Sequence, residues 1–286
     1  MKYNLKYLAD KILSAPFINE PFKHIYIEDF FSEEHFNEII RSKQIVAPKV
    51  STDAELINKL EEVGYKAIEF PGCITNKNKY LSWLQEKKNE IPKELQSWAN
   101  TACEGFGMVF RLKKLKSDIL SNVNDYIRGK EFNEAIAQRY DINPKKCYVD
   151  SGIQKYLNKY EISPHPDIRK KATTFMVNIN PSNASEKMDH HTHYLRFKSE
   201  YKYVQEFWET NSNKDRCWVP WDWAETTKTQ TKNNSIVIFS PSSDTLHGVK
   251  ASYDHLVTQR TQLYGNMWYN NVPWPGKNEA SWKDFV

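Results

Sequence analysis

The hydrophobic pattern of this chain changes near Lys145, and this change limits the folds that the chain can adopt. Before that point, apolar residues recur at helical spacing, as in residues 32–42 and 117–127. After it, short runs of β-branched and aromatic residues lie between turn residues, as in residues 173–179 and 234–239. Helices gathered in one half and strands in the other are typical of an α+β fold, whereas alternating elements would indicate a parallel α/β sheet.

A chain of 286 residues is long enough to form one large domain. We expect a mainly helical portion at residues 1–144, a β-rich core at 145–270 and a C-terminal tail at 271–286. Within the core, residues 182–232 are polar, carry several tryptophans and show no clear period. Long segments of this kind inside a compact domain are commonly functional loops, so we predict an insertion that forms a lid.

The tryptophans of this insertion allow a second interpretation. Trp208, Trp218, Trp221 and Trp223 lie close together in the sequence. Large aromatic side chains most often bury their area in a core, so fixed packing is the alternative to a lid.

Composition limits the compartment and the partners. No apolar run is long enough to span a bilayer, and residues 1–6 do not lead into a signal-peptide core. The four cysteines are far apart, which predicts reduced thiols and a cytoplasmic protein. The 40 basic and 36 acidic residues nearly balance, which disfavours a nucleic-acid partner. Composition thus predicts no membrane partner and gives no indication of oligomeric state.

Residues 163–167 and a distant histidine form the strongest functional pattern. His165 and Asp167 are two residues apart, and alternate residues of an extended chain point to the same side. Their flanking prolines favour extended backbone but cannot occupy a central ladder, so the segment should lie at a strand end. His247 follows a short apolar strand and a cluster of turn residues. Two histidines and one carboxylate are the set that holds non-haem Fe(II) with open positions.

Each of these residues also has an ordinary interpretation, as a surface pair or a turn residue. Only their combination and order predict a metal triad. A second group, Asp189 with His190, His191 and His193, could bind a metal weakly. No partner lies at the spacing of a structural metal site, so we predict a solvated or substrate-facing loop there.

Arg260 opens a further strand-like run after His247. With this residue, the region from Gly152 to Tyr269 resembles the Fe(II)/2-oxoglutarate-dependent oxygenases, in their prolyl-hydroxylase-like and phytanoyl-hydroxylase-like branches. The pattern of that family is His-x-Asp, a distal histidine and then a basic residue. Residues 21–31 also look like the opening strand of such proteins.

The resemblance implies a double-stranded β-helix, a jelly-roll or cupin-like core with the metal at its mouth. It further implies that His165, Asp167 and His247 hold Fe(II) and that Arg260 pairs with the far carboxylate of 2-oxoglutarate. A guanidinium suits that role because it stays charged and binds carboxylates in a bidentate fork. Lys250 is the alternative basic residue.

The implied reaction is a dioxygenase reaction that uses O2 and releases succinate and carbon dioxide, with ascorbate as a possible supporting reductant. Its expected result is the oxidation, usually hydroxylation, of an unactivated C–H bond in a small polar metabolite such as an amino acid or sugar derivative. Family halogenases replace the carboxylate ligand by a small residue, so Asp167 favours hydroxylation. Tyr156, Gln154 and Thr174 flank the triad and are expected either to contact the co-substrate or to be ordinary strand residues.

Two other classes of function stay open at this point. One is an oxygenase that acts on a protein, a peptide or a nucleobase. The other is a non-oxidative cupin-type isomerase or binding protein, in which the histidines are structural or bind another metal. Turnover of 2-oxoglutarate to succinate separates the oxygenases from the second class.

Overall fold

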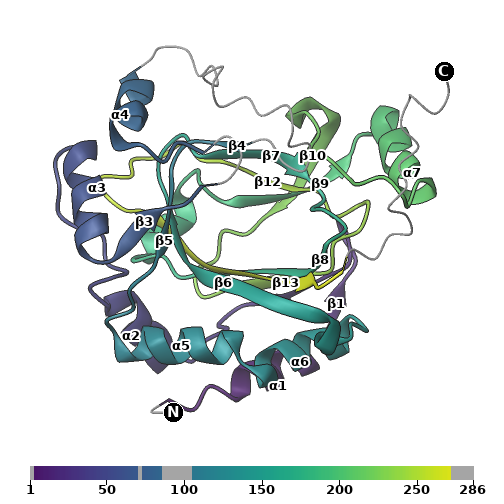
Figure 1. Cartoon of the computed structure of the whole chain (residues 1–286), viewed down its shortest axis with the longest axis horizontal. Helices are drawn as coiled ribbons and strands as arrows, with labels where there is room; N and C mark the ends of the chain where they lie inside the picture. Colours follow the sequence, from purple (N-terminus) through teal and green to yellow (C-terminus); the bar gives the residue numbers. More distant parts are fainter. Residues whose placement is uncertain (1–2, 70–72, 86–104, 272–286) are drawn as a thin grey trace.

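The computed structural model describes residues 3–69, 73–85 and 105–271. Two antiparallel sheets face one another and helices cover the outer side of the larger sheet, which gives a mixed α+β fold (Figure 1). The expected tail at 271–286 lies outside the described residues apart from its first residue. No helix in the described ranges is both long and apolar enough to cross a membrane. Three cysteines, Cys73, Cys147 and Cys217, are free thiols.

The larger sheet has eight strands, in the order β1 (Phe17–Ile18), β2 (His24–Ile27), β11 (Ile236–Phe239), β8 (Lys171–Asn178), β13 (Arg260–Tyr269), β6 (Cys147–Tyr156), β5 (Val109–Leu112) and β3 (Tyr65–Ala67). The smaller sheet has five, in the order β10 (Ala224–Thr229), β9 (Thr192–Phe197), β12 (His247–Lys250), β7 (Glu161–His165) and β4 (Gly105–Phe106). The portion before residue 144 thus contributes five short strands as well as helices.

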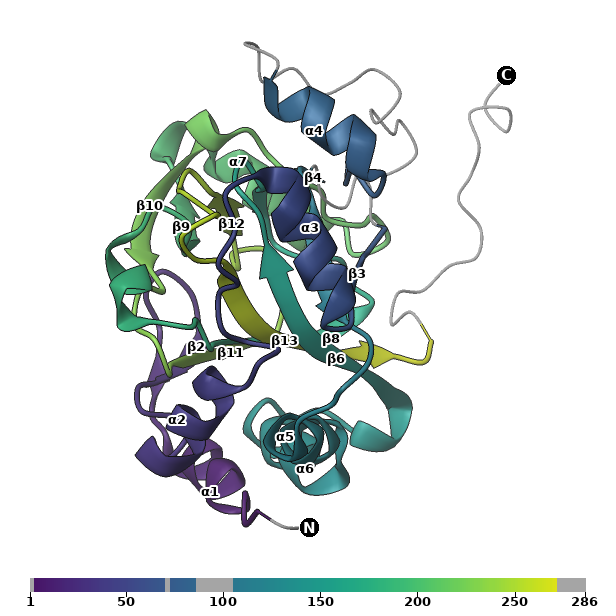
Figure 2. The same cartoon turned by 90° about the vertical axis from the view of Figure 1, so that its left-hand side faces the viewer.

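Four helices cover the outer face of the larger sheet: α1 (Tyr7–Ser14), α2 (Glu33–Arg41), α5 (Asp118–Arg128) and α6 (Lys130–Arg139) (Figure 2). Helix α2 begins where the sequence predicted, because the Ser32 side chain accepts a hydrogen bond from the backbone N–H of His35. Helices α3 (Asp53–Glu62) and α4 (Lys77–Gln85) lie near β3, and α7 (Lys202–Thr210) lies beyond the smaller sheet (Figure 1).

The contact between sheet and helices explains one glycine in the middle of β13. The Phe175 ring from β8 packs against Phe132 of α6, with ring centroids 5.3 Å apart. A Cβ at Gly265 would lie 2.2 Å from this ring. Only glycine therefore lets the aromatic ring lie across the neighbouring strand.

The two faces of the larger sheet differ in character. On β6 and β13, Ile153, Leu263 and Met267 point outward into the main hydrophobic core under the helices. Residues of the opposite parity, such as Gln154 and Gln262, line a cavity between the two sheets. A sheet covered on both faces usually buries apolar residues on both. The polar inner face is therefore not a second hydrophobic core but the lining of the cavity.

The structure corrects the expectation for residues 182–232. This segment is not a long stretch without regular structure, since it supplies β9, β10 and α7. Strand β9 lies between β10 and β12 and is hydrogen-bonded to both. The sequence did not reveal these strands because their hydrogen-bonding partners are distant in the chain and their outer residues are polar. Because β9 is an inner strand, we expect that the segment does not open as one lid.

The tryptophans of this segment are largely packing residues. Trp208 is buried in a small core with Leu195, Phe197 and Leu246, and Trp221 and Trp223 pack against the same core. Trp221 also donates a hydrogen bond from Nε1 to the Glu161 carboxylate at 2.7 Å. The alternative of fixed packing is thus the one that the side chains adopt.

Candidate metal centre and adjoining cavity

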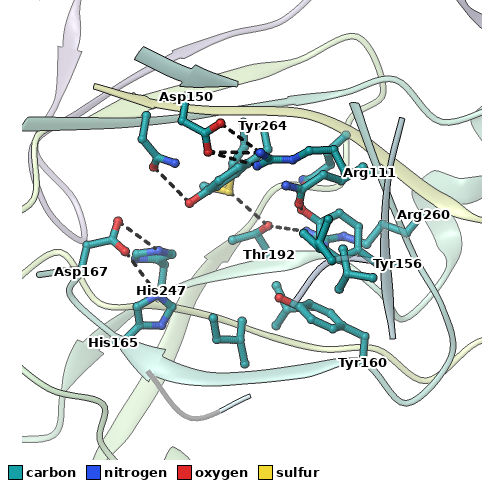
Figure 3. Close-up of a pocket in the computed structure, with 18 of the residues that line it drawn as sticks. Arg111, Asp150, Tyr156, Tyr160, His165, Asp167, Thr192, His247, Arg260 and Tyr264 are labelled. Atoms are coloured by element: carbon teal, nitrogen blue, oxygen red, sulfur yellow. Dashed lines mark hydrogen bonds and ion pairs between the residues drawn. The ribbon is translucent and has the colours of Figure 1, made fainter. Parts of the chain in front are cut away.

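A cavity of about 730 Å³ lies between the two sheets. Its lining includes His165, Asp167 and His247 as well as Arg260, so it joins all four residues that the sequence singled out. Figure 3 shows the triad on one side of this cavity and Arg260 with Tyr156 on another.

Two adjacent strands of the smaller sheet bring the three candidate ligands together. His165 is the last residue of β7 and His247 is the first of β12, and the two are direct partners in the ladder. One ligand atom from each of His165, Asp167 and His247 lies within 4.8 Å of the others, and all three residues are buried. Among the described residues, this is the one group of three or more such side chains close enough to hold a metal ion.

The backbone brings the Asp167 carboxylate to His165 and His247 in a different way from that expected. The strand ends at His165, and Asp167 has a φ of +62°, in the left-handed region that aspartate tolerates better than most residues. The backbone thus turns after Pro166 and directs the carboxylate back toward the two imidazoles. The expectation of a strand end at the prolines was correct, whereas the explanation by alternation along an extended chain was wrong.

Backbone carbonyls fix the orientation of both imidazoles. Nδ1 of His165 lies 2.8 Å from the carbonyl oxygen of Ser163, and Nδ1 of His247 lies 3.0 Å from that of Thr245. The two Nε2 atoms consequently face Asp167, at 3.4 Å and 3.7 Å from its carboxylate oxygens (Figure 3). Metal-binding histidines typically have their second nitrogen held in this way.

The Asp167 carboxylate is held at both oxygens. Thr174 donates its hydroxyl to Oδ2 at 2.7 Å, and Lys171 donates from Nζ to Oδ1 at 2.6 Å. Arg216 donates from Nε to the backbone carbonyl of Asp167 at 3.0 Å. Such contacts orient a ligand before a metal binds.

Electrostatics keep the candidate ligands in the forms that bind metals. Burial is the main cause that lowers the pKa of His247, to about 3, and His165 beside it adds to the effect. Burial alone would raise the pKa of Asp167, but Lys171 and His247 outweigh it and hold that pKa well below its usual range. At neutral pH the site therefore contains a neutral His247 and a carboxylate, as metal coordination requires.

Arg260 combines deep burial with an unused donor. Its side chain lies over the Tyr156 ring at 4.3 Å, and Nη2 donates to the Thr192 hydroxyl at 2.8 Å (Figure 3). Nη1 is buried without a hydrogen-bond partner among the described residues. A buried polar atom without a partner is costly, so the cavity is suited to an anion at this position. Lys250, the alternative, is exposed and does not line the cavity.

The structure separates the three residues expected to flank the co-substrate. Tyr156 and Gln154 line the cavity and are hydrogen-bonded to each other at 2.6 Å. Thr174 is not among the lining residues, and its hydroxyl contacts Asp167 and Asn266 instead. Thr174 is therefore placed to orient a metal ligand rather than to touch the co-substrate.

Several lining residues were missed by the sequence reasoning. Thr192 contacts Arg260, and Arg111 forms an ion pair with Asp150 at 3.0 Å (Figure 3). Lys171 contacts Asp167. For β13 a signal existed, because Arg260 and every second residue after it point into the cavity. No local signal identified Thr192 and Arg111, since their partners lie on strands distant in the chain. Lys171 reaches Asp167, four residues earlier, because the backbone turns at Asp167.

The prediction for His190 and His191 was wrong. Both are buried rather than solvated, and neither lines the cavity or belongs to the triad. Burial is the main cause that lowers the pKa of His190 to about 3 and of His191 to about 4, with Arg260 among the further causes. The segment precedes β9, which carries it into the interior.

Comparisons with known proteins return likenesses of structure only. No protein-family model matches the chain, and no curated protein matches it. A prolyl-4-hydroxylase of Pseudomonas putida is 9% identical, with 93% of this chain and 99% of that chain covered and a TM-score of 0.45. A prolyl hydroxylase from Trichoplax adhaerens, in complex with a hypoxia-inducible-factor peptide fragment, is 10% identical, with 93% and 90% covered and a TM-score of 0.44.

A third solved structure is an oxidoreductase of the 2OG-Fe(II) oxygenase family from Burkholderia pseudomallei. It is 5% identical, with 95% of this chain and 94% of that chain covered and a TM-score of 0.37. Sequence identities and scores this low assign no activity, so function is inferred from the side chains of the site.

Proposed function

We propose that this chain is an Fe(II)/2-oxoglutarate-dependent dioxygenase that oxidises, most often by hydroxylation, a C–H bond of a small polar metabolite such as an amino acid or sugar derivative. The observation that carries this proposal is the pairing of two features in one cavity. A buried His–Asp–His group with its ligand atoms within 4.8 Å offers a metal site, and Arg260 offers a buried donor without a partner.

The strand connections support a double-stranded β-helix. From β6 onward the chain alternates between the larger and the smaller sheet, except that β9 and β10 follow each other in the smaller one. Alternation of this kind between two facing sheets is typical of a jelly roll. The metal ligands then lie at the ends of β7 and β12, at the mouth of the barrel.

The chain's own residues would divide the binding tasks among themselves. His165, Asp167 and His247 would hold Fe(II), which with 2-oxoglutarate and O2 supplies the oxidising power while the co-substrate becomes succinate and carbon dioxide. Arg260 would bind the far carboxylate of 2-oxoglutarate, with Thr192 beside it. The buried cavity excludes water from this charge pair, which strengthens the attraction between the two charges. It also keeps water away from the reacting atoms.

The shape of the cavity favours a small substrate over a polymer. Small-molecule sites are typically enclosed clefts of about 300–1,000 Å³, and this cavity of about 730 Å³ lies between two sheets. A peptide would have to place one side chain in this cavity. A non-oxidative cupin-type protein would need the metal site but not the buried anion-binding group of Arg260 beside it.

The test is an assay of succinate release with Fe(II), 2-oxoglutarate and ascorbate over amino acids, sugars, nucleosides and peptides. We expect substrate-dependent succinate from the amino-acid or sugar classes, and none from a His165→Ala, His247→Ala double variant. Metal binding without any conversion of 2-oxoglutarate would instead favour the non-oxidative class. Succinate formation with peptides alone would contradict the assignment to a small metabolite.

A further inference from the structure

Lys171 is an unexpected residue beside the candidate metal ligands. It opens β8 opposite Trp268 of β13, and its side chain lines the cavity with only 10% exposure. A lysine side chain ordinarily carries its ammonium charge at neutral pH. A charged ammonium therefore projects into the cavity next to the metal site.

Not all hydrogen-bonding capacity at this point is used. An ammonium carries three N–H donors, and Lys171 donates to Asp167 and to the Tyr264 hydroxyl at 3.1 Å. Two of its three N–H groups are thus used, and the Tyr264 hydroxyl donates in turn to the side-chain oxygen of Asn266 at 3.0 Å. Lys171, Tyr264 and Asn266 all line the cavity.

The charge balance around Lys171 favours an additional anion. In the part of the chain that the structure describes, the charged residues lining the cavity are Arg111, Lys113, Lys171, Arg260, Glu69, Asp150 and Asp167. Arg111 is paired with Asp150. In the proposed enzyme, one carboxylate of 2-oxoglutarate would neutralise Arg260, and the other would lie at the metal with Asp167. Fe(II) and Lys171 together carry three positive charges and these two carboxylates carry two negative ones, so one positive charge is left over beside the metal.

We propose that Lys171 binds a carboxylate group of the substrate next to the metal centre. This inference rests on the proposed function and narrows its substrate class to small carboxylic acids, amino acids included. Lys171 thereby becomes a specificity-determining residue. If Lys171 instead served only to neutralise Asp167, its loss would weaken metal binding but would not affect the choice between acids and their neutral analogues.

The experiment compares acids with their amides. The probes are the L-amino acids and the corresponding L-amino acid amides, added to protein loaded with Co(II) and 2-oxoglutarate without oxygen and observed by ligand NMR and calorimetry. We expect at least one acid to bind roughly 30-fold more tightly than its amide, the least effect typical of a buried charge contact. Lys171→Met should remove this preference, and Lys171→Arg should retain part of it.

Lys113→Met is the matched control, because Lys113 carries the same charge at the cavity but is exposed. It should change the preference less than about threefold, since exposed charges are strongly screened. Circular dichroism melting establishes that each variant is folded. Equal binding of acid and amide, an equal effect of both methionine variants, or no binding of any acid would overturn the inference.

Separate titrations distinguish this inference from the proposed function. Co(II) and 2-oxoglutarate binding are measured in each protein before any amino acid is added. Failure of the wild type to bind either one contradicts the proposed function. Binding of both, without discrimination between acid and amide, contradicts only the role of Lys171.

Discussion

At the scale of single residues, this site depends on a few buried polar groups that lack partners or share one. Arg260 has one guanidinium nitrogen without a partner among the described residues, and Asp167 is shared between Lys171 and Thr174. Such groups are costly in a folded protein unless a ligand completes them. Their presence in one cavity therefore indicates a ligand-binding site rather than a contribution to the stability of the fold.

The role of Arg260 leads to a prediction about co-substrate affinity. Arg260→Ala should weaken 2-oxoglutarate binding by about 2–5 kcal/mol, or roughly 30- to several-thousand-fold, because it leaves a carboxylate unpaired in a buried site. Arg260→Lys should lose less, since it retains the charge. Isothermal calorimetry with the metal-loaded protein measures both. Lys250→Ala is the control, and a larger loss in that variant would show that the wrong basic residue was chosen.

The buried histidines lead to a prediction about pH. Burial lowers the pKa of His190 to about 3 and that of His191 to about 4 from the ordinary histidine value of 6.5, so below pH 6.5 the unfolded chain binds protons that the folded chain does not. Stability is therefore unaffected above about pH 6.5 and falls as the pH drops from there toward 4. Urea unfolding between pH 7 and 5 measures the slope, because carboxylates contribute little in that window.

His190→Gln should flatten this slope, since glutamine does not titrate. Lys171 and the carboxylates are unchanged in the variant, so its unfolding curve isolates the imidazole. An identical slope in both proteins would show that His190 is not responsible.

At the scale of elements, β9 decides whether residues 182–232 can move as one lid. Its Tyr194 is fully buried and is the ladder partner of His247 on β12. The strand thus helps to position a metal ligand. An element held on both sides by hydrogen bonds cannot leave without breaking the smaller sheet.

Hydrogen exchange tests this conclusion. The amides of β9 should exchange slowly both with and without metal and 2-oxoglutarate, because protection follows the stability of the surrounding sheet. The exposed residues 212–214 should exchange quickly in both states and serve as the internal reference. If β9 exchanged as fast as this loop in the free protein and slowed only on ligand binding, the lid interpretation would be restored.

At the scale of the whole molecule, ligand binding should raise the stability of the folded state. A metal that binds only the folded chain adds about 2.7 kcal/mol at a free concentration 100 times its Kd. The melting temperature should therefore rise when Co(II) or Fe(II) is added without oxygen. The His165→Ala, His247→Ala double variant should show no such rise, and an undiminished rise would place the metal elsewhere.

The sequence alone determined the features that depend on local patterns. The mixed α+β class followed from periodicity, and the helix expected in residues 32–42 is present as α2, with Ser32 as its N-cap. His165, Asp167 and His247 were recognisable because residue types and short spacings carry the chemistry of a metal triad. The sequence was enough to identify these three residues, and the fold then brings their ligand atoms within 4.8 Å of one another.

Only the tertiary structure decided which residues surround that triad. Thr192 reaches Arg260 across strands that are far apart in the chain. Lys171 and Thr174 follow Asp167 by only four and seven residues, and they reach its carboxylate because the backbone turns at Asp167. The tertiary structure also placed β9 inside a sheet and buried His190, where the polar sequence had indicated a solvated or substrate-facing loop. The physical reason is that strand pairing and burial depend on distant partners, which no local pattern of residues specifies.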